Sequence, residues 1–259
     1  LSLWVSYFYK AHFYSTIMLY LVGLGLNDEK DVSVKGMEVI KKAKAVYLED
    51  YTSRMQVDKE KLEKFYGKRI QKANREFVEK KIRIILEEAK KEDVAFLVQG
   101  DVHSATTHID LFLRAKKENI PVKVIFGVSI LTAVGVTGLS LYNFGKTISI
   151  PFHHENIASS YENLLINKKN GMHTLVLLDL DPENEKFLTI KEGLGYFKRQ
   201  GLDEDTLVVG CARIGSDDQI IRFGELRKIR EIDFGKPPFC IVIPGKLQFY
   251  EEEALESWK

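Results

Sequence analysis

The sequence predicts an α/β protein, in which short buried strands alternate with helices. Two apolar runs, at residues 19–22 and 94–98, have the length of strands that are buried on both faces. Each run is followed by a glycine-containing turn and later by a segment with helical spacing, an order typical of parallel sheets. The strand candidates come closer together after residue 146, so we expect a mixed sheet in the second half.

In the N-terminal half, the predicted helices follow strands or polar loops. Apolar side chains within residues 75–91 fall on one side of a helix, and the lysines and glutamates of this segment are interpreted as its solvated face. Thr106 or Thr107 is placed to cap the helix that follows. In chain order we predict strands at residues 19–22, 45–48, 94–98 and 122–126, and helices at residues 32–45, 59–66, 75–91 and 109–118.

The boundary between two domains is predicted near Gly127, which lies between the 122–126 strand and Ser129. A cleft between two domains is a common location for a small-molecule site. The chain is therefore divided into residues 18–127 and 128–259, with residues 1–17 set apart. The further strands are predicted at residues 146–150, 173–179, 206–212 and 239–243.

The turns after the strands at 19–22 and 94–98 are the first candidates for ligand contact, because ligands of open parallel sheets bind beyond the carboxyl ends of the strands. Asp28 stands where a dinucleotide fingerprint needs its third glycine, and no phosphate-binding Gly-Lys-Ser/Thr follows. Gly100 would let a ligand approach the backbone, and Asp101 offers a carboxylate for a ribose hydroxyl or an ammonium group. The alternative is an ordinary turn in which Asp101 bonds its own backbone. In either case we expect Asp101 to lie in an exposed loop.

The composition fits a compact protein, with 45% hydrophobic and 29% charged residues. The formal net charge of +1 gives no overall field that would recruit nucleic acid or an anionic membrane. Cys211 and Cys240 lie far apart in apolar segments, so buried thiols are favoured over a disulfide or a metal pair. His153 and His154 have no companions at zinc-ligand spacing, so no metal is predicted. A cytoplasmic location is the default expectation.

Residues 1–17 are rich in aromatic side chains and differ from the rest of the chain. They lack the basic start and small-residue cleavage site of a signal peptide, and Lys10 and His12 interrupt a stretch that is too short to span a bilayer. We favour an extension outside the two predicted domains, such as a translated upstream region. The alternative is an arm that packs its aromatic rings on a dimer partner.

A series of short motifs follows in consistent order at residues 18–26, 100–101, 105–108, 129–130, 138–139, 142–145, 173–179, 212–215 and 233–238. These motifs closely resemble those of the diphthine synthase family, S-adenosylmethionine-dependent enzymes that share the tetrapyrrole-methylase fold. The resemblance extends from Met18 to about Tyr250. Each motif is short, but their joint occurrence at this spacing is highly specific.

The resemblance implies two α/β domains of the tetrapyrrole-methylase type, with S-adenosylmethionine in the cleft between them. Without it, Ile130, Leu178 and Phe239 would be read as ordinary core residues. A mixed lining of apolar and polar side chains would suit a cofactor made of adenine, ribose and an amino acid. Carried over position by position, the cofactor contacts are Leu26, Asp101, Ser104, Ser129, Ile130, Leu178, Ile214 and Phe239.

The resemblance also implies the reaction, a methyl transfer to nitrogen that leaves S-adenosyl-L-homocysteine. The implied acceptor is the 3-amino-3-carboxypropyl group on a histidine of translation elongation factor 2, during diphthamide biosynthesis. Because the first transfer needs a neutral amine, His108 and His173 are considered as bases, although histidines near strand ends are more often structural. No catalytic residue is assigned.

One position departs from the family pattern, since Val102 stands where the family has proline. Proline fixes φ and removes a backbone donor, so valine is expected to loosen the loop while fold and cofactor site persist.

Two other functions stay open on the sequence alone. A tetrapyrrole C-methyltransferase would need a deep apolar trough with charged residues for the carboxylates of the macrocycle, and a non-catalytic protein would bind S-adenosylmethionine or the elongation factor without turnover. The resemblance implies a homodimer with no nucleic-acid or membrane partner. From Met18 the chain has nearly the length of archaeal members, which make trimethylated diphthine, so we expect three methyl groups rather than the additional methyl ester of eukaryotic members.

Overall fold

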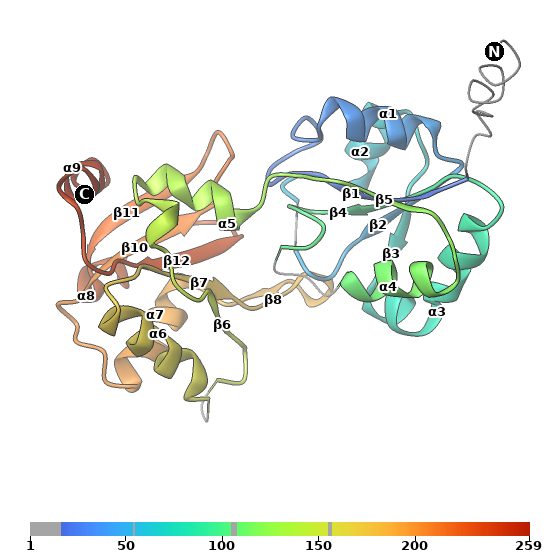
Figure 1. Ribbon diagram of the computed structural model, residues 1–259. Helices are drawn as coiled ribbons and strands as arrows, with labels where there is room; N and C mark the ends of the chain where they lie inside the picture. Colours follow the sequence, from blue (N-terminus) through green and yellow to red (C-terminus); the bar gives the residue numbers. More distant parts are fainter. Residues whose placement is uncertain (1–16, 54, 105–107, 155–156) are drawn as a thin grey trace, which may run out of the picture.

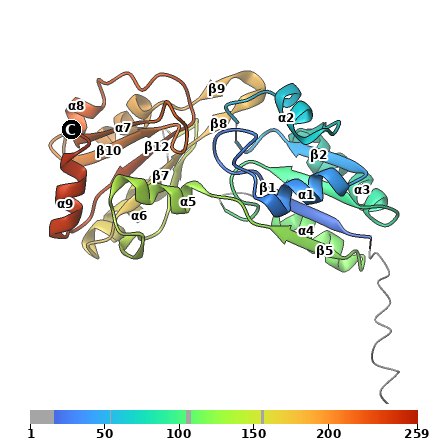
Figure 2. The same ribbon diagram turned by 90° about the horizontal axis from the view of Figure 1, so that it is seen from above.

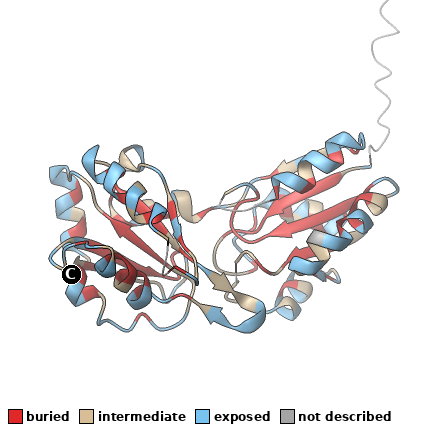
Figure 3. Cartoon of the chain, turned by 90° about the horizontal axis from the view of Figure 1, so that it is seen from below, coloured by how far each residue is buried: buried red, intermediate tan, exposed pale blue. Residues whose placement is uncertain are grey.

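Two sheets, one in each half of the chain, organise the molecule. The computed structural model describes residues 17–53, 55–104, 108–154 and 157–259. Figure 1 shows two lobes side by side, connected by the segment between β5 (Val122–Ile125) and α5 (Ile130–Ala133). In both lobes the strands are largely buried, as the red ribbons in Figure 3 show. The α/β class predicted from the sequence is confirmed.

The first sheet is entirely parallel and carries helices on both faces (Figure 1). Its other elements are β1 (Leu19–Gly23), β2 (Ala45–Glu49), β3 (Gln71–Ala73), β4 (Val94–Val98), α1 (Val34–Lys42), α2 (Lys59–Tyr66), α3 (Arg75–Ala89) and α4 (Ile109–Lys117). The strand order is β3-β2-β4-β1-β5. Ile40 of α1 and Leu62 of α2 are buried on one face, and Ile85 of α3 and Leu111 of α4 on the other.

The second sheet is mixed, as the close spacing of its predicted strands indicated. Its elements are β6 (Ile148–Ile150), β7 (Thr174–Leu178), β10 (Leu207–Ala212), β11 (Ile220–Glu225), β12 (Phe239–Ile243), α6 (Ser159–Lys169), α7 (Ile190–Arg199), α8 (Leu226–Ile229), α9 (Phe249–Glu256) and the 3-10 turns η1 (Val134–Thr137) and η2 (Leu141–Asn143). The order is β11-β10-β12-β7-β6, and only the β6–β7 pair among these described strands is parallel. Leu164 and Leu194 pack on one face, Val134 and Leu255 on the other.

A two-stranded hairpin reaches from the second lobe toward the first (Figures 1 and 2). It consists of β8 (Leu180–Asp181), the 3-10 turn η3 (Pro182–Asn184) and β9 (Lys186–Phe187). Asp181 stabilises the turn by accepting hydrogen bonds from the backbone and the side chain of Asn184. The hairpin therefore presents a defined edge to the first lobe.

Most of the predicted elements are present, with boundaries that differ by a few residues. The helix predicted at 32–45 is shorter, because Ser33 Oγ accepts the Gly36 N–H at its start and β2 already begins at Ala45. Sequence reasoning missed β3, β11, the hairpin and the helices after residue 128. The start of α7 could have been predicted from the sequence, because Thr189 and Glu192 have the spacing of a capping box and form one in the structure.

Two interpretations fall outside the described residues. These are the capping role of Thr106 or Thr107 and the role of the aromatic N-terminal segment, and both stay predictions. None of the helices in the described parts of the chain combines the length and the apolar character needed to cross a bilayer.

Three glycines meet where the first lobe passes into the second. A Cβ on Gly23 would lie 2.6 Å from the Gly127 nitrogen and 2.7 Å from the Gly100 oxygen, and a Cβ on Gly127 would clash with that same oxygen. Because these neighbours are backbone atoms, they cannot rotate away. The ends of β1 and β4 and the segment after β5 therefore come close only if Gly23 and Gly127 lack a side chain, and Gly100 contributes its carbonyl oxygen to the contact. We propose on this ground that the domain boundary lies near Gly127.

Replacing Gly127 by alanine should therefore destabilise the protein. Forcing atoms into such a packed contact typically costs about 1–3 kcal/mol, and here the contact is with backbone. Chemical denaturation of wild type and Gly127→Ala measures the difference in the free energy of unfolding.

Gly195→Ala is the matched control, since its added Cβ would have as its nearest neighbour the flexible Arg199 side chain at 3.5 Å. In the middle of α7 this change should be neutral or stabilise by about 0.5–1 kcal/mol. Equal stability of Gly127→Ala and wild type would contradict the role of the glycine contact.

Candidate functional site

A cavity of about 370 Å³ lies between the two lobes, and we call it the interlobe cavity. Its walls come from the turns after β1, β2 and β4, from the starts of α3 and α5, and from β6, β7, β10, β12 and their adjoining turns. All eight residues that were predicted to contact the cofactor line it, namely Leu26, Asp101, Ser104, Ser129, Ile130, Leu178, Ile214 and Phe239. The fold brings these residues together, while their contact with a cofactor stays a prediction.

Asp101 organises the turn after β4. Its Oδ1 accepts hydrogen bonds from the His103 N–H and the Ser104 hydroxyl, both at 3.1 Å, and its Oδ2 accepts the Gly127 N–H at 3.3 Å. A carboxylate offers about four acceptor sites, so these three bonds leave room for one ligand group. Asp101 therefore bonds its own loop, as the alternative interpretation held, and also lines the cavity. The expectation that Asp101 is exposed is wrong, because only 9% of the residue is accessible.

Two serines add polar groups to the lining. Ser129 Oγ accepts the Leu131 N–H at 3.1 Å and caps α5, which leaves its hydroxyl hydrogen as a donor. Ser104 donates its hydrogen to Asp101, which leaves its oxygen as an acceptor. Together with the Asp101 carboxylate, the lining therefore offers both donors and acceptors beside its apolar residues.

The apolar part of the lining connects the two lobes. Leu26, from the turn after β1, packs with the core cluster of the second lobe that contains Ile214. A Cβ on Gly215 would lie 3.4 Å from Leu26 Cβ, so the turn after β10 closely approaches the first lobe. Leu178 and Ile214 are 7% and 8% exposed, so they serve as core residues and cavity walls at once.

The structure gives Gly100 and Val102 structural roles beside those expected from the sequence. Gly100 has φ = +76°, a conformation that favours glycine, whereas an added Cβ would find its nearest neighbour, Val128 O, at an ordinary 3.8 Å. The backbone conformation, rather than crowding by other parts of the protein, therefore favours glycine here, and the approach of a ligand to Gly100 stays a prediction. Val102 is fully buried in the core of the first lobe with Phe96 and Leu111, so the valine contributes apolar packing at this position.

Arg213 lines the cavity, but its guanidinium donates hydrogen bonds to other groups of the protein. Its Nε donates to Asp218 Oδ2 at 2.8 Å, Nη2 donates to the Asp218 carbonyl, and Nη1 donates to the carbonyls of Phe234 and Lys236. The residue is 5% exposed and has φ = +53°. Arg213 thus fastens the turn after β10 to the segment before β12.

The two cysteines also line the cavity, at directly opposite positions of β10 and β12. Both are buried free thiols, as the sequence analysis favoured. The neighbouring Cys240 thiol and burial raise the pKa of Cys211, so Cys211 stays an uncharged thiol. Within the described residues, no group of three or more His, Cys, Asp or Glu side chains could hold a metal ion.

Neither histidine considered as a base lines the interlobe cavity. His108 is buried among the rings of Tyr51 and Phe96, with Nε2 3.7 Å from Glu49 Oε2. His173 lies on the side of α9, where its Nε2 is 3.2 Å from Glu251 Oε1 and its Nδ1 accepts the Gly245 N–H. Both side chains support the fold.

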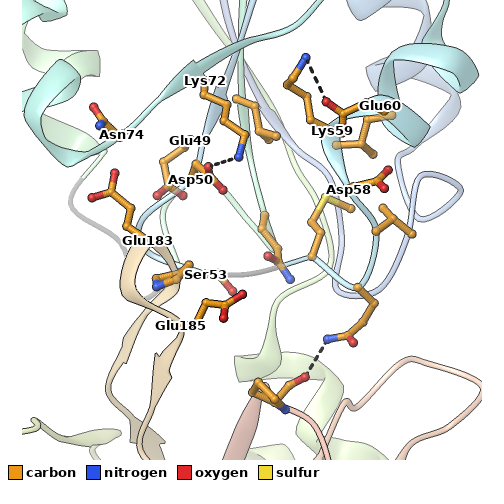
Figure 4. A pocket seen from close by; sticks show the side chains of 18 of the residues that line it. Glu49, Asp50, Ser53, Asp58, Lys59, Glu60, Lys72, Asn74, Glu183 and Glu185 are labelled. Carbon is orange, nitrogen blue, oxygen red and sulfur yellow. Dashed lines mark hydrogen bonds and ion pairs between the residues drawn. The ribbon is translucent and has the colours of Figure 1, made fainter.

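A larger cavity of about 1170 Å³ adjoins the interlobe cavity, and Ser53 and Gln99 line both. It lies between the loop after β2, the start of α3 and the β8–β9 hairpin. Figure 4 shows Glu183 and Glu185 of the hairpin on one side and Glu49 and other residues of the first lobe on the other. Seven carboxylates and four ammonium groups belong to the described lining, so we call it the acidic cavity.

Sequence reasoning missed part of the interlobe lining. The recognised motifs contain Arg213 and Asp179, which also line the interlobe cavity. Nothing in the sequence, however, indicated that the loop after β2 and the start of α3 reach this cavity. The missed lining residues include Tyr51, Thr52, Ser53, Arg75, Gln99 and Ser149.

The chain has counterparts among known sequences and solved structures. Residues 18–230 match the family described as Tetrapyrrole (Corrin/Porphyrin) Methylases. A diphthine methyl ester synthase of Dictyostelium discoideum is 42% identical over 269 residues, which cover 94% of this chain and 98% of the relative. A diphthine synthase of Methanocaldococcus jannaschii is 43% identical over 251 residues, with 92% and 98% covered. A crystal structure of diphthine synthase superposes with a TM-score of 0.88 at 37% identity, covering 93% of this chain and 95% of the other.

The fold, the interlobe cavity and these matches define the class: the chain belongs to the tetrapyrrole methylases. The high identity along nearly the whole chain is more specific than the class. Within that family the chain belongs with the diphthine synthases, the methyltransferases of diphthamide biosynthesis, and it is an S-adenosylmethionine-dependent enzyme.

Proposed function

We propose that S-adenosylmethionine binds in the interlobe cavity and that its methyl group passes to the amine of the 3-amino-3-carboxypropyl-histidine of translation elongation factor 2, which becomes diphthine. The observation that carries this proposal is the convergence of all eight predicted residues on one cavity beside a second, larger one. The relatives named for diphthine synthesis support the choice of acceptor.

The lining of the interlobe cavity suits this cofactor. Leu26, Ile214 and Phe239 offer apolar surface for an adenine ring, and Asp101 has an acceptor site left for a ribose hydroxyl or an ammonium group. The volume of about 370 Å³ lies in the range of roughly 300–1,000 Å³ that small-molecule pockets occupy.

When bound, the cofactor supplies a methyl group on a sulfonium sulfur, and the residues of the chain supply position. Amine, methyl carbon and sulfur must lie in line, and such positioning is worth roughly 7–11 kcal/mol of the barrier at best. The lobes hold the cavity walls on two rigid sheets, which supports this role. His108 and His173 lie elsewhere, so we propose that the proton of the acceptor amine leaves through the acidic cavity to solvent.

The acidic cavity is the proposed path of the acceptor. Its volume of about 1170 Å³ accommodates a long side chain projecting from another protein, and Ser53 and Gln99 border both cavities. The alternative acceptor, a tetrapyrrole, carries several carboxylates, which the carboxylate-rich lining would repel. The lining thus favours a protein acceptor over the macrocycle.

The activity is tested by incubating the protein with labelled S-adenosylmethionine and elongation factor 2, with the factor supplied either unmodified or carrying the 3-amino-3-carboxypropyl group. We expect label only on the modified factor, and mass spectrometry should show three added methyl groups. A fourth methyl that is lost under mild base would indicate an additional ester.

The two groups of relatives are 42% and 43% identical to the chain, so identity does not distinguish the two products. Cofactor binding without any transfer would instead support the non-catalytic alternative and contradict the proposal.

Asp101→Ala should weaken both the fold and cofactor binding. The change removes three hydrogen bonds at a buried residue, which should lower the free energy of unfolding by about 1–3 kcal/mol. Loss of a charge-assisted bond to the ligand should weaken affinity by a further 1.5–3 kcal/mol, or roughly 10- to 150-fold. Calorimetric titration with S-adenosylhomocysteine, below the measured melting temperature, checks the second effect.

Asp110→Ala removes an exposed carboxylate that pairs with Arg114 on α4, and it should leave affinity unchanged. If Asp101→Ala binds S-adenosylhomocysteine as tightly as wild type, Asp101 is not a cofactor ligand.

We further propose that the enzyme is a cytoplasmic homodimer, with a complete interlobe cavity in each subunit and without a nucleic-acid or membrane partner. The proposed contact surface, defined by Leu141, Tyr142, Phe249 and Tyr250, contains side chains that are 43%, 96%, 80% and 46% exposed. The residues are neighbours, because the Ser140 N–H before η2 donates to Glu251 of α9 at 2.9 Å. Burying such apolar surface against a second copy is favourable by roughly 25 cal/mol per Å².

Light scattering should therefore give about twice the chain mass of 29.7 kDa, both for the full chain and for a variant that starts at Met18.

The double substitution Tyr142→Asp with Phe249→Asp should give a monomer, because it puts charges into the contact surface. Leu113→Asp, at a 57% exposed position on α4, should leave the dimer intact. A wild-type monomer would refute the proposal, and a dimer lost only on removal of residues 1–17 would assign the contact to that segment.

A further inference from the structure

The acceptor proposed above carries a carboxylate next to its amine, and that carboxylate needs a cationic partner when it leaves water. Among the described residues, two cations line the interlobe cavity, Arg75 and Arg213. The guanidinium of Arg213 already donates to one carboxylate oxygen and to backbone carbonyls of Asp218, Phe234 and Lys236. Arg75 is therefore the candidate that the structure offers.

Arg75 lies at the border between the two cavities. It is the first residue of α3, and its neighbours Asn74, Glu76 and Phe77 line the acidic cavity, whereas Arg75 lines the interlobe cavity. Figure 4 shows Asn74 at the edge of the acidic cavity, on the side of Glu183. Arg75 is thus placed where a side chain entering from the acidic cavity would first meet the interlobe cavity.

The guanidinium of Arg75 is held in position by an aromatic ring. Its Cζ lies 5.6 Å from the ring centroid of Tyr51, within the range of a cation–π contact. Tyr51 is itself buried, with its ring edge-on to that of His108. A guanidinium that stacks in this way keeps its N–H edge available for a planar, two-pronged bond to a carboxylate.

The nearby acidic residue Asp181 is already engaged. It accepts hydrogen bonds from the Asn184 side chain at 2.7 Å and from the Asn184 N–H at 3.3 Å. The Asn184 bonds, with smaller effects from the charges of Lys186 and then Arg75, hold the pKa of Asp181 below its usual range. Asp181 thus interacts with Arg75 through charge alone, without a hydrogen bond between the two residues among those described, and its hydrogen-bond partner is Asn184 of the same hairpin.

We propose that Arg75 binds the carboxylate of the 3-amino-3-carboxypropyl group and so directs the neighbouring amine toward the methyl donor. This inference rests on the proposed function and names the residue that would select the acceptor. The cofactor itself also carries a carboxylate. All eight predicted cofactor residues, however, come from the turns after β1 and β4, the start of α5, and the second sheet with its turns, and none of the eight lines the acidic cavity. Arg75, by contrast, is flanked in the chain by Asn74, Glu76 and Phe77, which line the acidic cavity, and it therefore lies on the acceptor's side.

Arg75 would act as a specificity residue. A bidentate guanidinium–carboxylate pair distinguishes a free acid from its neutral amide, because the amide has one acceptor oxygen and no charge. The enzyme should therefore prefer acceptors whose carboxylate is free. Arginine cannot be replaced by lysine without loss here, because an ammonium lacks the planar fork and stacks less well on Tyr51.

The test is a binding experiment on the full chain saturated with S-adenosylhomocysteine. The two probes are synthetic peptides that carry the 3-amino-3-carboxypropyl-histidine, one with the free carboxylate and one with its primary amide. Wild type should bind the acid at least ten times more tightly than the amide. Arg75→Gln should bind both peptides equally, Arg75→Lys should keep only part of the preference, and affinity for S-adenosylhomocysteine should change less than twofold.

Arg83→Gln is the control, since Arg83 lies on the same helix, has an 83% exposed side chain and pairs with Glu87. It should behave as wild type. The proposal is overturned if wild type shows no preference for the acid, if Arg75→Gln keeps that preference, or if Arg75→Gln loses affinity for S-adenosylhomocysteine, which would assign Arg75 to the cofactor. A wild-type protein that binds neither peptide and transfers no methyl group would overturn the proposed function together with this inference, whereas normal transfer without a preference for the acid overturns only the role of Arg75.

Discussion

The close backbone contact among Gly23, Gly100 and Gly127 is the constraint on which the rest of the structure depends. It lets the ends of β1 and β4 approach the segment that leaves β5, closer than a side chain on Gly23 or Gly127 would permit. Asp101 fixes the same place from the polar side, because its carboxylate accepts the Gly127 N–H. Since the chain enters the second lobe directly after Gly127, this contact also brings Ser129 and the start of α5 next to Asp101. The packing that connects the lobes and the arrangement of the cavity walls therefore have one origin.

The two sheets contribute to the cavity in different ways. The parallel sheet supplies the turns at the carboxyl ends of its strands, where ligands of such sheets commonly lie. The mixed sheet supplies strand residues themselves, such as Leu178 and Phe239, together with the turn that Arg213 fastens. The apolar contact of Leu26 with the Gly215 turn joins the two contributions. A ligand in the interlobe cavity would contact groups that are held by two separate cores. The position of the cavity walls therefore does not depend on the order of the loops alone.

The sequence predicted the central strands well, because residues 94–98 and 239–243 are apolar runs whose period and length determine their structure without long-range information. It predicted the cavity residues through the family motifs, and the fold does bring all eight together. It missed β3, which is three residues long and polar at two of them, since its place at the edge of the sheet depends on pairing with β2. Arg75 and Tyr51 were missed for a similar reason: one begins a helix and the other lies in a polar loop, and only tertiary structure brings their side chains together. The buried state of Asp101 likewise follows from a contact with Gly127, 26 positions away.

The wall between the two cavities depends on a single buried carboxylate. Glu49, at the end of β2, accepts the N–H groups of Tyr51 and Thr52 at 2.6 Å and 2.5 Å on one oxygen and the Thr52 hydroxyl at 2.6 Å on the other. Glu49 lines the acidic cavity, whereas Tyr51 and Thr52 line the interlobe cavity, so these bonds cross the wall from one side to the other. A buried carboxylate with several donors is well compensated for its loss of hydration and holds its partners in one geometry. The position of the Tyr51 ring, and with it that of the Arg75 guanidinium stacked on it, is in this way set by the last residue of a core strand. An acceptor group that contacts Arg75 would therefore be oriented by the first sheet, which also holds Asp101 at the interlobe cavity.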